Sequence, residues 1–406
     1  MAKRNTDDAA TEAGGGQVID SRVVFRGFMM SFIEVKKVED RWRMIEFVLF
    51  PWTSRIYEND PAWIPPLISE QKKLFDRKKS YFFEIGEGDF FLAYRQGKPV
   101  GRITAHVNHL YEEKYDQDTG FFGFYESINS QEVANALLDA ASNWLRERGK
   151  KIIQGPQSFS IYDSIGFETE GFQITPIVGL LHFAPYYKDL AEAYGFTKCI
   201  DWSCYLVRDM EDYKPYLEQV RKEFMKGQGI EYKTLQKGEM KKRVREIHKI
   251  FNIAWEGNWG HLPLTERQLD TFYDEIKMVA IPELTIFAED KGKTVGFCVS
   301  IADANQALRL LNGRLYPWRL RKAFKEVKKA RKIRTIIMGV LPEYRGRLID
   351  EVFYLMTIET GLAMGFNASD CSLVVETNHK MIGALKHLKA ERYKTYRIYE
   401  KRIDSL

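Results

Sequence analysis

Two segments in different halves of the chain read alike, and this repeat constrains the fold more than any other feature. Asp89–Asn108 and Glu283–Ala302 each consist of an apolar run, a turn and a second, alternating apolar run. Both turns carry the motif G-K-x-V-G, at Gly97–Gly101 and at Gly292–Gly296. β-Branched and aromatic residues on either side of a glycine turn are typical of an antiparallel hairpin. The sequence therefore predicts the same hairpin twice.

Similar elements follow each hairpin. In the first half, hydrophobic periodicity predicts a helix, a strand, a helix and a strand, at Ser130–Arg148, Lys151–Gln154, Pro185–Tyr194 and Cys199–Val207. In the second half it predicts strand, helix, strand, helix and closing strands, at Arg334–Leu341, Ile349–Met364, Ser372–Glu376, His379–Leu388 and around Tyr396–Arg402. We expect each half to end in a pair of strands. This shared order indicates a duplicated domain.

The predicted fold class is α/β, with two tandem domains, each a mixed, mostly antiparallel sheet flanked by helices. A chain of 406 residues is also longer than one ordinary hydrophobic core needs. We expect a disordered tail over residues 1–30, a first domain over 31–208, a linker helix over 209–229 and a second domain over 230–406.

Composition excludes several classes of protein. A net charge of +5 over the whole chain gives no general reason to expect a nucleic-acid partner. The four cysteines have no C-x-x-C spacing, so we predict neither a metal site nor a disulfide framework, and a cytoplasmic location. No apolar run approaches the roughly 18 residues of a membrane-spanning helix, and the acidic N-terminus is not that of a signal peptide.

The second half contains the stretch Gly339-Val340-Leu341-Pro342-Glu343-Tyr344-Arg345-Gly346 between a strand and a helix. It resembles the V-x-P-x-x-R-G motif of the GNAT superfamily, which implies acyl-CoA as a co-substrate and no permanently bound cofactor. In that fold two strands diverge and pantetheine binds the exposed backbone, here of Gly339, Val340 and Leu341. The free N–H groups of the following helix bind pyrophosphate, here with Arg345, Gly346 and Arg347. Asn378 is a further candidate contact, or only the cap of the last helix.

The resemblance extends from about Phe32 to Ile403. Over this range the chain is similar to a bacterial GNAT-like family that includes bacterial ceramide synthases, which transfer an acyl group from acyl-CoA to a sphingoid base. The residues that carry this resemblance are Gly120–Glu126, Gly155-Pro156, Phe159-Ser160, Glu170–Phe172, Pro185–Tyr187, Asn258–Gly260, Pro263, Asp303, Asn305 and Tyr396–Glu400.

Direct acyl transfer to an amine needs a base for the amine and a proton for the leaving thiolate. Glu376 ends the strand expected to diverge from Val340, which makes it the candidate base. Asp303 is the candidate partner of the acceptor amine. Leu385 stands where many GNAT enzymes have the tyrosine acid, so the candidate acid is Tyr396 or a water, unless the thiolate leaves unassisted. The structural alternatives are a salt bridge for Glu376 and a turn position for Asp303.

An apolar substrate pocket is predicted around a loop with two tryptophans. Trp255 and Trp259 flank a glycine, and Asn258 and His261 could anchor a polar group of the substrate. Asn305 is a further candidate substrate contact. The alternative is that these aromatic residues pack in the core.

A basic segment over residues 314–334 has ten Lys or Arg against one acid, Glu326, with aromatic residues between them. Pro317 is expected to start a helix there. A basic amphipathic helix of this kind suits an anionic membrane surface, and the alternative is a solvated charged helix.

The function predicted from these observations is N-acylation of a long-chain amino alcohol by acyl-CoA, at a peripheral site on the inner face of the membrane. The first half lacks the V-x-P motif and is expected not to bind coenzyme A. Three alternatives stay open: acetylation of a small amine, transfer from aminoacyl-tRNA, and a non-catalytic binder of lipid or acyl-CoA. Leu348, Asp350 and Leu385 depart from the superfamily pattern and favour the last of these.

Overall fold

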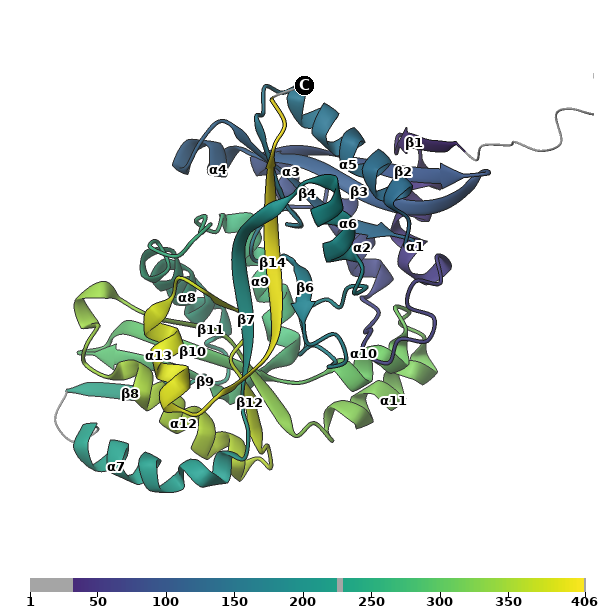
Figure 1. Ribbon diagram of the computed structural model, residues 1–406. Coiled ribbons are helices and arrows are strands. Elements are labelled where there is room, and N and C mark those ends of the chain that lie inside the picture. The colour runs from purple at the N-terminus through teal and green to yellow at the C-terminus, as the bar shows by residue number, and fades with distance from the viewer. Residues whose placement is uncertain (1–31, 225–228, 405–406) are drawn as a thin grey trace, which may run out of the picture. The chain divides into compact units, whose positions relative to one another are not determined.

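The computed structural model describes residues 32–224 and 229–404, so the predicted tail over residues 1–30 lies outside the described residues. Among the described residues, the strands form one 14-stranded sheet with helices packed around it (Figure 1). Twelve strands follow the order β1-β2-β3-β4-β5-β14-β7-β12-β11-β10-β9-β8, while β13 pairs with β7 and β6 pairs with β14. The predicted α/β class is confirmed.

Both predicted hairpins are present. The first joins β2 (Gly86–Arg95) to β3 (Lys98–Asn108), and the second joins β9 (Ala280–Asp290) to β10 (Lys293–Ala302). Each has a two-residue turn in which both residues have positive φ, 52° and 73° at Gln96-Gly97 and 49° and 78° at Lys291-Gly292. Such turns match the twist of the flanking strands, and glycine takes positive φ at little cost.

The first half continues from its hairpin into β4 (Thr119–Ser127) and α5 (Gln131–Arg146), whose apolar face packs on the sheet. The remaining elements are β1 (Ile33–Lys37), α1 (Arg41–Thr53), α2 (Ile68–Phe75), α3 (Phe82–Ile85), α4 (His109–Lys114), β5 (Ile152–Gly155), β6 (Phe167–Glu170), α6 (Tyr187–Tyr194) and β7 (Thr197–Val207).

The second half has the same order around its own hairpin. It consists of β8 (Ile230–Thr234), α8 (Met240–Ala254), α9 (Glu266–Val279), α10 (Asn305–Leu311), α11 (Pro317–Val327), β11 (Lys332–Val340), the 3-10 turn η2 (Pro342–Tyr344), α12 (Ile349–Ala363), β12 (Ala368–Asp370), β13 (Val374–Val375), α13 (His379–His387) and β14 (Glu391–Arg402). Between the halves, β7 leads into η1 (Met210–Tyr213) and α7 (Lys214–Phe224).

The two halves share their last strands. β14, at the end of the chain, pairs with β5 of the first half, and β7 pairs with β12 and β13 of the second. β7 and β14 also pair with each other over their length. Each half therefore ends in one strand rather than the expected pair, and these two last strands pair with each other across the halves. The exchange buries Tyr396, Ile398 and Tyr399 of β14 in the first half's core. Burial of this apolar surface stabilises the exchanged arrangement.

No helix among the described residues is long and apolar enough to cross a membrane. All four cysteines are free, and three of them are buried.

Candidate active site

Along most of one edge of β11, no strand of the described residues pairs with it. β11 pairs in parallel with β12 only from Lys332 to Arg334, and beyond this point the chain after β12 forms β13 against β7 instead. We call the side of Thr335–Val340 that faces away from β10 the open edge. Ile336, Ile337 and Met338 are partly exposed although β11 is an inner strand of the sheet. This confirms the predicted divergence of two strands.

The backbone of Met338 and Val340 is turned toward the open edge. Leu341 N–H donates to the Val295 carbonyl of β10, and in an antiparallel pair alternate residues point their polar groups to opposite sides. Trp255, which follows α8, confirms this direction because its Nε1 donates to the Met338 carbonyl at 2.9 Å. β11 also has one extra residue, Ile336, relative to β10, and such bulges are frequent beside active sites.

The equivalent edge in the first half is filled by the chain itself. β4 pairs in parallel with β5 only from Thr119 to Phe121. Like β11, it also has a β-bulge in its pairing with the neighbouring hairpin strand, β3. The segment after β5 then covers the rest of the edge: Gln157 N–H donates to the Phe122 carbonyl, and Phe124 N–H donates to Ser158 Oγ. The described residues therefore contain two equivalent edges, and the edge of β11 lacks such a covering segment.

Gly123→Ala tests how tightly this segment fills the first edge. An added Cβ would clash with the Gln157 carbonyl oxygen, a backbone atom that cannot turn away. We expect the free energy of unfolding to fall by roughly 1–3 kcal/mol, measured by chemical denaturation. Gly383→Ala in α13 is the control, because nothing lies within 4 Å of its added Cβ and alanine favours helix. Equal stability of the two variants would show that the segment is loosely held.

The loop after β11 brings several predicted residues together near the end of α8. Arg345 Nη2 donates to the Ala254 carbonyl at 2.7 Å, and the Arg347 guanidinium lies 4.9 Å from the Tyr344 ring centre. Gly346 has a φ of 79° and open space around it. Leu341 is not free to bind pantetheine, because its N–H donates to Val295 and its carbonyl accepts from Tyr344 N–H. Met338, which the motif did not indicate, takes its place on the open edge.

The two tryptophans of the loop after α8 contact different strands. Trp255 contacts β11, whereas the Trp259 ring lies 6.3 Å from that of Trp202 on β7. His261 is 1% exposed, and its Nδ1 pairs with the Tyr162 hydroxyl at 2.5 Å. Burial and the charge of Lys114 lower the pKa of His261 to about 4, so the imidazole is neutral at physiological pH. The Asn258 carbonyl accepts from His261 N–H and closes the loop.

Glu376 lies directly after β13 and is held by β7. Its Oε2 pairs with Lys198 Nζ at 2.7 Å, and its Oε1 accepts from Asp201 N–H. The side chain is 40% exposed. The salt bridge anticipated as the structural alternative is therefore present. Asn378 caps α13, accepting from Met381 N–H.

Three other predicted residues lie away from the loop after β11. Asp303 is at the opposite end of β11, where its N–H donates to the Lys332 carbonyl and its carboxylate lies 3.4 Å from Lys332 Nζ. Asn305 is buried and donates to the Pro176 carbonyl. Tyr396 is 1% exposed, its hydroxyl donates to the Leu181 carbonyl, and β7 separates it from β13. Burial raises the pKa of Tyr396, which makes it a weaker acid than an exposed tyrosine.

The half-buried Arg334 and the buried Asp370 lie beside the start of the open edge, and the sequence did not indicate either as part of the site. The Arg334 guanidinium donates to the Ser372 and Val178 carbonyls and so joins β11 to the chain after β12. Asp370, at the end of β12, accepts from Ser372 N–H and from the Tyr393 hydroxyl. Burial raises the pKa of Asp370 despite these bonds.

A second buried group links the first half to β14. His182 Nε2 pairs with Asp60 at 2.8 Å and its Nδ1 with Glu168 at 3.0 Å, while Glu168 pairs with Lys394 at 2.9 Å. Burial lowers the pKa of His182, but the two carboxylates outweigh it and raise the pKa overall. These residues stand far apart in the sequence with no motif spacing, so only the strand exchange could have revealed them.

Comparisons with known proteins agree with this geometry. Protein YghO from Escherichia coli (strain K12) is 31% identical to this chain over 397 residues, covering 94% of this chain and 97% of that protein. Bacterial ceramide synthase from Caulobacter vibrioides (strain NA1000 / CB15N) is 31% identical over 388 residues, covering 92% and 98%. A solved tandem GNAT protein from the clavulanic acid biosynthesis pathway shares the fold, with a TM-score of 0.54, 11% identity, and 92% and 100% coverage. No protein-family model matches the chain.

The shared sheet, the open edge of β11 and these likenesses define the class: the protein is a GNAT-type acyltransferase with a tandem GNAT fold. Within that class, the chain belongs to the family that contains the bacterial ceramide synthase of Caulobacter vibrioides.

Proposed function

We propose that this protein is an acyl-CoA-dependent N-acyltransferase whose acceptor is a long-chain amino alcohol of the sphingoid type. In the reaction, the amine nitrogen attacks the thioester carbonyl carbon, the C–S bond breaks, and coenzyme A leaves as the thiol. The amine loses one proton to a base, and the products are an amide and free coenzyme A.

The observation that carries this proposal is the relation to a named ceramide synthase along nearly the whole of both chains. The open edge of β11 supports acyl-CoA as the donor, because pantetheine amides can complete the ladder at the Met338 N–H and the Val340 backbone. The Met338 carbonyl already accepts from Trp255 Nε1. Arg345, Gly346 and Arg347 are the candidates for the pyrophosphate at the start of α12. Asp350 and Glu351, in the first turn of α12, carry the opposite charge and limit this site to the preceding loop.

The insertion between β10 and β11 supports a lipid acceptor. It contains α10 and α11, and five of its large apolar side chains are exposed: Leu310, Leu315, Tyr316, Trp318 and Phe324. Trp318 and Phe324 are 63% and 68% exposed, beside the basic residues of segment 314–334. Exposed aromatic and basic side chains on one short helix suit the surface of an anionic membrane. We propose that the protein works there as a peripheral enzyme on the cytoplasmic side.

Thiol release from a panel of acyl-CoA donors, C2 to C18, tests the proposal when measured with and without a sphingoid base, with the amide product identified by mass spectrometry. We expect release that depends on the base and prefers long chains. Release with a small soluble amine and acetyl-CoA would instead indicate a small-molecule acetyltransferase. Binding of acyl-CoA without release under any condition would indicate a non-catalytic binder.

A further inference from the structure

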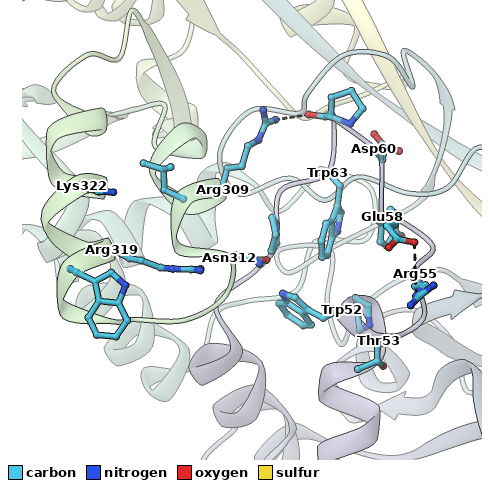
Figure 2. A pocket seen from close by; sticks show the side chains of 16 residues that line it. Trp52, Thr53, Arg55, Glu58, Asp60, Trp63, Arg309, Asn312, Arg319 and Lys322 are labelled. Carbon is cyan, nitrogen blue, oxygen red and sulfur yellow. Dashed lines mark hydrogen bonds and ion pairs between the residues drawn. The ribbon is translucent and has the colours of Figure 1, made fainter.

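A cavity with a volume of about 800 Å³ lies apart from the open edge. One wall is the end of α1 and the loop after it, and the other is the α10–α11 insertion (Figure 2). The two walls are joined, because Ile68 N–H donates to the Gly313 carbonyl and Arg309 donates to the Pro61 carbonyl. The cavity therefore opens beside the exposed aromatic and basic side chains of the insertion.

The α11 wall of this cavity carries positive charge without a matching acid. Arg319 and Lys322 of α11 line it. Arg319 Nη1 donates to the Leu311 carbonyl. Lys322 makes no hydrogen bond or ion pair with any residue within 32–224 and 229–404. The nearest negative charge on Lys322's own helix, Glu326, pairs with Lys329.

The opposite wall has two carboxylates, and both already have partners. Glu58 lies 3.9 Å from the Arg55 guanidinium, and Asp60 pairs with His182. Arg309 is a further cation in the lining. With four cations against two acids, the cavity favours an anion, and the unpaired cations place that anion on the α11 side.

The wall formed by α1 and the loop after it is also aromatic. Trp63 stacks on Tyr57 with ring centres 4.9 Å apart and meets Trp52 edge to face at 5.9 Å. At the mouth, the exposed Trp318 ring stacks on Tyr316 at 4.8 Å. Aromatic side chains with polar neighbours are enriched where one side of a molecule is apolar and the other is wet. The ligand should therefore combine an anionic group with apolar chains.

We propose that this cavity binds the phosphate headgroup of an anionic glycerophospholipid, with the phosphate at Lys322 and Arg319 and the acyl chains leaving past Trp318 toward the bilayer. This inference rests on the membrane contact proposed above, but not on the acceptor or on acyl-CoA. It predicts that attachment to the membrane has a specific, saturable component in addition to general attraction between the basic segment and negative charge.

Lys322→Gln tests this site, and Lys325→Gln is its matched control. Both lysines are exposed, lie on α11 and lose one charge, but Lys325 does not line the cavity. Binding of dihexanoyl-phosphatidylglycerol, which stays soluble, is followed by tryptophan fluorescence in the full chain. We expect Lys322→Gln to weaken binding about tenfold, because it loses one charge-assisted hydrogen bond, and Lys325→Gln to weaken it less than twofold.

The source of the phosphate and the fold are controlled in the same experiment. Inorganic phosphate should compete only weakly, since it lacks acyl chains, and dihexanoyl-phosphatidylcholine should bind more weakly than the anionic lipid. Circular dichroism and the urea unfolding midpoint of both variants should match those of the unchanged protein, which checks that the fold is retained. Equal weakening by the two substitutions, or wild-type affinity in Lys322→Gln, would overturn the proposal and leave only diffuse electrostatic attraction.

Discussion

Lys394→Met should lower the free energy of unfolding by about 3 kcal/mol, the lower end for a broken buried ion pair, because Glu168 keeps His182 as its second partner. The side chains of Lys394 and Glu168 are both 0% exposed, and their charged atoms are 2.9 Å apart. Lys394 also donates to the Gly171 carbonyl. Urea denaturation followed by tryptophan fluorescence measures the effect.

Two controls separate the buried charge from other causes. Arg402→Gln, also on β14, removes an exposed partner of Asp404 and should change stability by less than about 1 kcal/mol. The double variant Glu168→Gln/Lys394→Met removes both charges and should be more stable than Lys394→Met alone. A Lys394→Met protein as stable as Arg402→Gln would contradict the exchange of β14 into the first half.

Glu376→Gln should lower kcat by roughly 100-fold if Glu376 takes the proton of the acceptor amine, since general bases contribute about 10²–10⁴-fold. The amide keeps the size and the hydrogen-bond acceptor of the side chain but cannot take up a proton. KM for acyl-CoA should change little, because the donor is proposed to bind at β11. Steady-state kinetics with acyl-CoA and a sphingoid base across a pH series measure both quantities.

Lys198→Gln distinguishes this role from the salt bridge. It breaks the same 2.7 Å ion pair but leaves the carboxylate in place. A catalytic Glu376 predicts that Lys198→Gln keeps most of the activity. Similar losses of activity and stability in both variants would mean that Glu376 only ties β13 to β7.

Local elements of this fold could be predicted from the sequence, because hairpins and amphipathic helices follow from neighbouring residues. The turns at Gly97 and Gly292, α5 and α12 all appear within a few residues of their expected bounds. The exchange of β7 and β14 could not be predicted. Their apolar alternation is satisfied equally well by pairing within each half or between halves, and the choice depends on contacts across the whole chain.

The candidate site was predictable only where a motif marks it. The stretch Gly339–Gly346 located the end of β11, but not that Leu341 is engaged and Met338 is turned outward. The sequence makes Tyr396 a candidate acid because Leu385 replaces the usual tyrosine. It does not predict that Tyr396 is buried in the first half's core, because that burial depends on the strand exchange. The cavity beside α11 gave no sequence signal beyond the basic segment, because its other wall comes from residues after α1.

We propose that the open edge of β11 holds the acyl-CoA donor. A crystal structure of the protein with a thioether analogue of a long-chain acyl-CoA, which cannot transfer its chain, tests this most directly. We predict that the pantetheine amides hydrogen-bond to the backbone of Met338 and Val340, with the pyrophosphate at Arg345 and Gly346. An analogue bound instead along β4, displacing Gln157 and Ser158, or in the cavity beside α11 would show that the open edge of β11 is not the donor site.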